Sequence, residues 1–210
     1  MTELFISAFV TLFVVIDPPG CAPIYASLTT GASAAQRRAM AIRAVAIATA
    51  ILLVFALWGK QLLRLLGIAL DSFRIAGGIM LFLIALEMVF EKRTKRRNER
   101  AEKVRARSDE LPQVEDVSVF PMAMPMLAGP GSIATTMLLM SRAQGTASTL
   151  VILAALAAVM LLSLLALIAA LPLMRLVGEQ VEAVISRLLG VLLAALAAQY
   201  VIDGLREAMG

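Results

Sequence analysis

The sequence predicts an all-α polytopic membrane protein. Of its 210 residues 60% are hydrophobic, and its mean hydropathy of +0.89 lies far outside the range of soluble proteins. Apolar stretches of about 20 residues, the length that crosses a bilayer as a helix, recur along the chain. No run of alternating polar and apolar residues indicates the strands of a β-barrel.

Six transmembrane segments are expected from the spacing of these apolar stretches. In chain order they cover residues 4–28, 38–59, 70–91, 117–140, 148–173 and 185–206.

The first segment contains a break. Thirteen mostly apolar residues, Leu4 to Ile16, are followed by Asp17-Pro18-Pro19-Gly20 and then by more apolar chain. Two consecutive prolines remove backbone donors and clash with the preceding turn, so the helix opens there. An ionisable residue such as Asp17 at a membrane-embedded break indicates a functional site. The alternative is that Pro18 ends the helix at the membrane surface, with Asp17 among the lipid headgroups.

The fourth segment contains a matching break, Gly129-Pro130-Gly131. A second pair of similar motifs, Arg74-Ile75-Ala76-Gly77 and Arg187-Leu188-Leu189-Gly190, opens the third and sixth segments. The two pairs are separated by nearly equal offsets, 111 residues from Gly20 to Gly131 and 113 from Arg74 to Arg187. Because each half has an odd number of spans, this repetition predicts two inverted three-helix repeats with broken helices in segments 1 and 4. Such paired breaks typify the substrate sites of transporters.

We therefore expect a first repeat over residues 1–91, a charged linker over 92–116 and a second repeat over 117–210. The stretch from Glu91 to Asp116 holds nine Lys/Arg and seven Asp/Glu residues. Counted by side, fourteen basic residues fall on the linker's side of the membrane and five on the other. The positive-inside rule then predicts a cytoplasmic linker and two periplasmic termini.

Candidate substrate-binding residues follow from the two breaks. Glycines there let the backbone approach a ligand, the amides after each break can receive an anionic group, and hydroxyl and amide side chains can bind substrate. The candidates are Asp17, Gly20, Cys21, Gly129, Gly131, Ser132, Thr135 and Gln199. Arg74 and Arg187 are possible charge partners, although an arginine at a helix start more often reaches lipid phosphate.

Other chemistry finds little support in the sequence. Histidine is absent and Cys21 is the single cysteine, so we expect no metal site, no cofactor and no disulfide. Ser132 follows a Gly-Pro-Gly turn as in some membrane proteases, but no histidine or nearby lysine provides a base, so no enzyme is expected. The basic residues of the linker fit membrane orientation better than nucleic-acid binding.

The motifs together resemble the MarC family. The resemblance rests on Asp17-Pro18-Pro19-Gly20 with Pro23, Phe73 to Gly78, Pro121 to Gly131, and Asp203-Gly204. It implies a six-span bacterial inner-membrane protein similar to the lysine-exporter superfamily, some of whose members are described as neutral amino-acid transporters. Family members commonly carry asparagine where this chain has Cys21. If that asparagine contacts the substrate, Cys21 changes the substrate specificity of this chain.

The favoured function is a secondary transporter that moves a small solute by alternating access. The expected substrate is a neutral amino acid. No nucleotide-binding motif is present, so a gradient of H⁺ or Na⁺ would supply the energy. The partners are then a small-molecule substrate, a coupling ion and the lipid bilayer. The alternative is a channel or a membrane assembly factor without a transport cycle.

Overall fold

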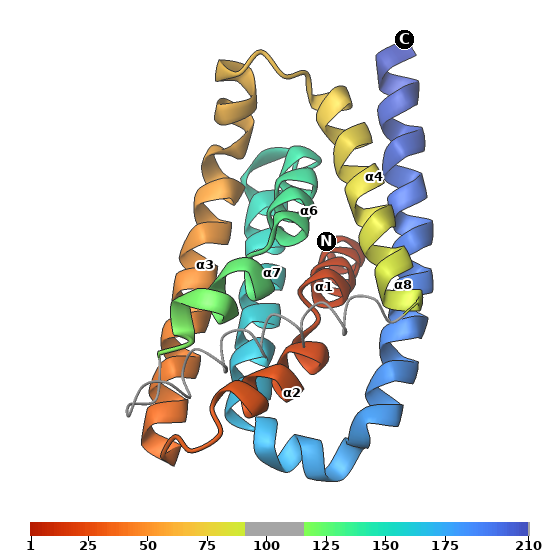
Figure 1. Ribbon diagram of the computed structural model, residues 1–210. Helices are drawn as coiled ribbons and strands as arrows, with labels where there is room; N and C mark the ends of the chain where they lie inside the picture. The colour runs from red at the N-terminus through yellow and green to blue at the C-terminus, as the bar shows by residue number, and fades with distance from the viewer. Residues whose placement is uncertain (91–115, 210) are drawn as a thin grey trace.

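The structure, a computed structural model, describes residues 1–90 and 116–209, with the side chains of residues 173–183 outside that description. Every regular element in these ranges is helical, as the sequence predicts. Except for Asp116, the predicted linker lies outside the described residues. The elements, shown in Figure 1, are α1 (Thr2–Ile16), α2 (Pro18–Leu28), α3 (Ala34–Leu65), α4 (Leu70–Val89), η1 (Ser118–Leu127), α6 (Pro130–Ser141), α7 (Gly145–Ile168) and α8 (Ala170–Met209).

Several helices of the bundle are long enough to span a membrane. Among the described residues, five helical spans are long and apolar enough to cross a membrane, one of which joins α1 and α2. A sixth is formed when η1 and α6, bent by 51° at their break, are counted as one. The structure thus has five or six candidate spans, with breaks between α1 and α2 and between η1 and α6, and the count of six segments stays a prediction.

Two helices begin earlier than the hydrophobic pattern predicts. α3 starts at Ala34, not residue 38, because Ser33 forms a capping box with Gln36. The Ser33 hydroxyl accepts a hydrogen bond from the Gln36 amide at 3.2 Å, and the Gln36 side chain accepts one from the Ser33 amide at 2.8 Å. α8 starts at Ala170, before the polar stretch expected as a loop. Pro172 lies in its first turn, where a missing N–H breaks no helical hydrogen bond.

α4 and α8 form the most extensive helix pair in the described structure, side by side in Figure 1. Glycines bring the two backbones together. A Cβ on Gly78 would lie 2.9 Å from the Ala197 carbonyl oxygen, and one on Gly204 would lie 3.0 Å from the Asp71 carbonyl oxygen. The alanine-rich run of α8 therefore packs closely on α4 at Gly78.

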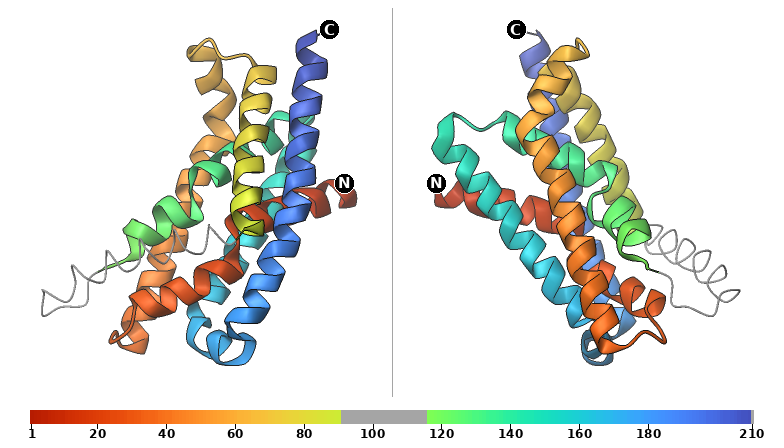
Figure 2. Two further views of the ribbon diagram at one scale, coloured as in Figure 1. Left: turned by 45° about the vertical axis from the view of Figure 1, so that its right-hand side comes forward. Right: turned by 90° about the vertical axis from the view of Figure 1, so that its left-hand side faces the viewer.

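The two halves of the chain interlock. α1 and α2 pack on α7 of the second half, while η1 and α6 pack on α3 of the first half. Figure 2 shows the two broken helices crossing the bundle obliquely between the longer helices. The larger apolar core lies among α1, α2, α3, η1 and α7, and a smaller one joins the end of α1 to α4, α6 and α8.

Polar contacts tie both ends of the bundle. At the lower end of Figure 1, the Tyr25 hydroxyl donates to the Arg37 carbonyl, which holds α2 to α3. Arg43 of α3 pairs with Asp116 at 2.5 Å. Hydrogen bonds from Ser118, together with the Arg43 guanidinium, lower the pKa of Asp116 despite its slight burial. At the upper end, Arg74 pairs with Glu207 and Arg142 with Asp203, so α8 is tied to both α4 and α6.

We expect Gly78→Val to lower the stability of the folded protein. Its Cβ meets backbone atoms of α8, which cannot move aside as a flexible side chain can, and such overpacking costs about 1–3 kcal/mol. The measurement is thermal unfolding of the purified protein in detergent, with Ala76→Val, at an exposed position of the same helix, as the control. Equal melting temperatures for the two variants would contradict the close α4–α8 contact.

Candidate functional site

The first break is centred on Asp17. Pro18 and Pro19 have no N–H to donate to the carbonyls of Val14 and Val15, so α1 cannot continue in regular helical geometry. Its last turn closes where the Asp17 amide donates to the Phe13 carbonyl at 2.9 Å. Asp17 then takes a left-handed conformation, φ 57° and ψ 63°, which few residues other than glycine, asparagine and aspartate tolerate. The chain restarts as α2 at Pro18.

The Asp17 side chain caps the helix that follows it. Its Oδ1 accepts from the Gly20 amide at 3.2 Å, and its backbone carbonyl accepts from the Cys21 amide at 3.1 Å. Only 3% of the residue is exposed. The partial positive charge at the start of α2 attracts a carboxylate in this position. Asp17 is thus buried at the break, as the sequence predicts, and is not a surface residue among lipid headgroups.

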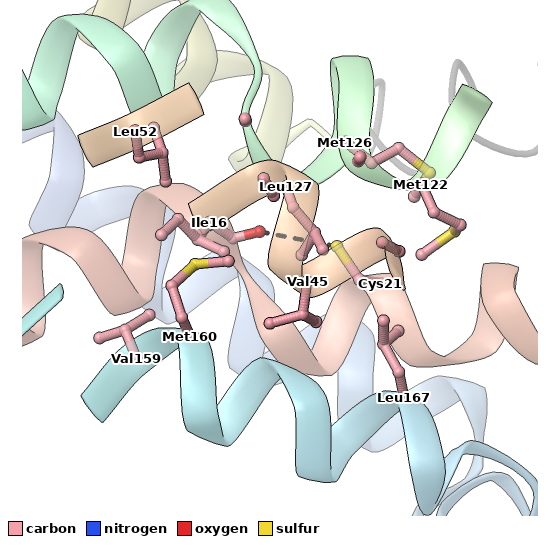
Figure 3. Packing of buried hydrophobic residues seen from close by; sticks show 14 of the residues in the cluster. Ile16, Cys21, Val45, Leu52, Met122, Met126, Leu127, Val159, Met160 and Leu167 are labelled. Carbon is pink, nitrogen blue, oxygen red and sulfur yellow. Dashed lines mark hydrogen bonds between the residues drawn. The ribbon is translucent and has the colours of Figure 1, made fainter. Parts of the chain in front are cut away.

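Cys21 bridges the break from the other side. Its Sγ donates to the Ile16 carbonyl oxygen at 3.6 Å, one of the acceptors that the interrupted helix leaves available. The thiol is fully buried, and Figure 3 shows it among apolar side chains that include Val45, Leu127 and Leu167. In this structure the thiol therefore hydrogen-bonds to the backbone of the interrupted helix. A contact between Cys21 and substrate stays a prediction.

The second break is built from glycine and proline in place of a carboxylate. η1 is irregular, with extended backbone angles at Phe120 and Met124, and it leads to Gly129, whose backbone is also extended. A side chain at Gly129 would overlap the Pro125 carbonyl oxygen, so this position requires glycine. Pro130 then occupies the first position of α6, which needs no amide donor.

The start of α6 lies against the first break. A Cβ on Gly131 would overlap Ile84 Cδ1 of α4 and would lie 3.6 Å from Cγ1 of Val15, two residues before Asp17. Helices α1 and α6 are therefore in contact where each is interrupted. Figure 1 shows α2 and α6 running from this central region toward opposite ends of the bundle.

Three buried hydroxyl groups follow the second break. Ser132, Thr135 and Thr136 are 3%, 0% and 1% exposed. The Thr136 hydroxyl donates to the Ser132 carbonyl at 2.7 Å, the usual fate of threonine in a membrane helix. The Thr135 hydroxyl finds no hydrogen-bond partner among the residues that the structure describes.

The remaining candidates lie on α4 and α8. Gln199 is exposed on α8, where its side chain donates to Asp203 at 2.7 Å. Arg74 is buried and forms its ion pair with Glu207, and Arg187 is exposed on α8. The structure therefore places Gly131 against Val15, two residues before Asp17, and Ser132 and Thr135 follow Gly131 on α6. It groups Gln199 and Arg74 with the polar end of α8.

Sequence reasoning missed one polar cluster at that end. Arg142 pairs with Asp203 and also lies 4.5 Å from the centre of the Tyr200 ring, a cation–π contact. Arg142 follows α6, whereas Asp203 and Tyr200 lie on α8, so no local spacing could have paired Arg142 with them. No group of three metal-ligating side chains occurs among the described side chains of residues 1–90, 116–172 and 184–209.

Comparison with known proteins places the chain in a family. A family model described as MarC family integral membrane protein matches residues 2–209. The chain belongs to the MarC family. This confirms the resemblance drawn from the two breaks and the Phe73 to Gly78 motif, and it makes the protein an integral membrane protein.

Relatives of similar length occur in bacteria and archaea. The chain is 34% identical to a UPF0056 membrane protein of Archaeoglobus fulgidus, over 98% of this chain and 93% of the relative. It is 34% identical to the UPF0056 inner membrane protein YhgN of Escherichia coli, over 98% of each. It is 32% identical to the UPF0056 membrane protein YvbG of Bacillus subtilis, over 98% of this chain and 96% of the relative. No solved structure matches the chain.

The capping role of Asp17 predicts an order of stabilities. Asp17→Asn keeps an oxygen that can accept from the Gly20 amide, whereas Asp17→Ala removes the cap, a loss of about 0.5–2 kcal/mol. We expect the melting temperature to fall more for the alanine variant than for the asparagine variant. Asp71→Ala, which removes a less buried carboxylate from the first turn of α4, is the control. An alanine variant as stable as the wild type would show that the cap contributes nothing.

Proposed function

We propose that this MarC family member is a secondary transporter of small neutral amino acids, driven by an ion gradient through alternating access. The observation that carries the proposal is the meeting of two broken helices in the buried centre of the bundle, where Gly131 lies beside Val15. Interrupted helices at membrane depth expose backbone groups that can bind a substrate while the rest of the bundle remains intact.

The helix contacts support an inverted repeat. The packing of α1 and α2 on α7 has its counterpart in the packing of η1 and α6 on α3. The contact of α4 with α6 has its counterpart in that of α8 with α2, while α4 and α8 pack on each other. Such mirrored contacts are expected if the halves are related by a twofold axis in the membrane plane. Motion of one repeat against the other could then open the centre to either side in turn.

A neutral amino acid fits the chemistry of the two breaks. The Asp17 carboxylate can attract an ammonium group, and a helix start can accept a carboxylate. The apolar surroundings, which include Val15 and Ile84, suit an aliphatic side chain better than a charged one. H⁺ or Na⁺ is the proposed coupling ion.

The decisive measurement is uptake of radiolabelled neutral amino acids into proteoliposomes that contain the purified protein. We expect uptake that saturates with substrate concentration and stops when the H⁺ and Na⁺ gradients are dissipated. Asp17→Asn should reduce uptake about ten- to a hundredfold, the effect of losing one charge-assisted hydrogen bond. Asp71→Asn, outside the breaks, is the control.

Two other outcomes would reject the transporter. Flux that rises linearly with concentration and needs no coupling gradient would indicate a channel. The absence of any flux from a correctly folded protein would favour an assembly factor.

We also propose that the protein lies in the inner membrane, as the printed name of the Escherichia coli relative states for YhgN, with both termini periplasmic. The α2–α3 connection and the turn between α7 and α8 lie at one end of the bundle in Figure 1, and the α3–α4 loop and the C-terminus lie at the other. This alternation agrees with the basic residues falling mainly on one side.

Cysteine labelling tests the orientation. In a Cys21→Ser background, Thr30→Cys and Gln144→Cys each place one thiol at an exposed position, the first next to α3 and the second next to α7. In intact cells we expect an impermeant thiol reagent to label the cysteine at position 144 and to reach the one at position 30 only after lysis. The opposite pattern would reverse the proposed topology and leave the helical repeat unaffected.

A further inference from the structure

The two breaks differ at the residue that caps the restarted helix. Asp17 is the N-cap residue of α2, and Gly129 is the N-cap residue of α6. In the first half the Asp17 carboxylate caps α2 through the Gly20 amide. In the second half the N-cap residue has no side chain, and within the described part of the chain no side chain caps the start of α6.

We propose that the start of α6 is the subsite for the carboxylate of the substrate, and that Thr135 is a ligand-binding residue in it. The substrate's carboxylate would take, in the second half, the role that the Asp17 carboxylate has in the first. This inference rests on the proposed function for the identity of the substrate, and it assigns the anionic and cationic groups of that substrate to different halves of the chain.

The first turn of α6 is suited to an anion. The amides of Gly131 and Ser132 lie in the part of a helix that has no internal acceptor, and the helix dipole adds partial positive charge there. Both residues are buried, so water screens this charge little. Gly131 carries no side chain of its own, and the aliphatic carbons of Ile84 and Val15 lie against it.

Thr135 supplies independent evidence for a ligand. Its hydroxyl is fully buried and has no partner among the described residues, a costly state that bound ligands commonly relieve. Thr135 lies one turn after Gly131, hence on the same helix face, and Cα–Cβ bonds in a helix tilt toward its N-terminus. The side chain therefore covers the first turn of α6, where the hydroxyl can donate to a bound carboxylate.

The neighbouring residue provides a matched control. Thr136 has the same side chain on the same helix and nearly the same burial, but its hydroxyl donates to the Ser132 carbonyl at 2.7 Å. A hydroxyl already satisfied in this way has no donor left for a ligand. Comparing valine substitutions at the two positions separates ligand binding from the structural effect of removing a buried hydroxyl.

The experiment measures equilibrium binding to the full-length protein in lipid nanodiscs. The probes are a panel of neutral L-amino acids, the corresponding amino-acid amides, which keep the ammonium group but lack the carboxylate, and propionate, which has only the carboxylate. We expect wild-type protein to bind at least one amino acid and to bind its amide at least about tenfold more weakly. Thr135→Val should weaken binding of the amino acid about ten- to a hundredfold and leave binding of the amide unchanged. Thr136→Val should leave both affinities close to wild type.

Protein folding is checked by melting temperature without ligand. Valine is isosteric with threonine, so Thr135→Val, which removes an unpaired hydroxyl, should melt at or above the wild-type temperature, and Thr136→Val at or below it. If Thr135→Val melts well below Thr136→Val, the hydroxyl has a structural partner and the subsite is rejected.

The remaining outcomes distinguish the subsite from the transport function. Equal binding of an amino acid and its amide, or equal effects of the two valine variants, overturns the subsite even if uptake into proteoliposomes is saturable and coupled. Binding of propionate or amino acids that depends on Thr135, without any uptake, supports the subsite and rejects the transporter. If no carboxylate probe binds the folded wild-type protein, the subsite is wrong.

Discussion

The hydrogen bond from the Gly20 amide to the Asp17 carboxylate allows a helix to end and restart inside an apolar bundle. Pro18 and Pro19 stop α1, and the left-handed backbone at Asp17 redirects the chain. Backbone groups at membrane depth need partners within the protein. Asp17 and Cys21 supply partners on both sides of the break, the carboxylate for an amide and the thiol for a carbonyl. After this redirection α2 packs on α7 and α8 of the second half.

Around this centre the bundle combines two kinds of packing. α4 and α8 approach backbone to backbone at Gly78 and Gly204, which leaves no room for side chains between them. The broken helices instead pack against the opposite half of the chain, α1 and α2 on α7, η1 and α6 on α3. Both kinds of packing therefore join the first half of the chain to the second.

The charged residues gather away from the centre. Arg74, Arg142, Asp203 and Glu207 form ion pairs that hold the end of α8 to α4 and α6. Arg43 and Asp116 pair near the opposite end. Arg74, which the sequence marks as a possible charge partner, pairs with Glu207, a residue 133 positions later. Without the fold, a choice among acidic partners at such separations has no basis.

Sequence alone determined the class of the protein, its long apolar helices and the location of both breaks, because proline, glycine and long apolar runs act on the backbone locally. It also identified the burial of Asp17, since a carboxylate inside an apolar span must face protein or water. Tertiary structure decided which of these features meet. The helical start at Ala170, the contact of Gly131 with α1 and α4, and the separation of Gln199 from the breaks depend on how helices pack, which no local pattern encodes. The contrast between Thr135 and Thr136 shows the same division, since the two residues are adjacent in sequence and similarly buried. The Thr136 hydroxyl donates to the Ser132 carbonyl, whereas the Thr135 hydroxyl finds no partner among the residues described.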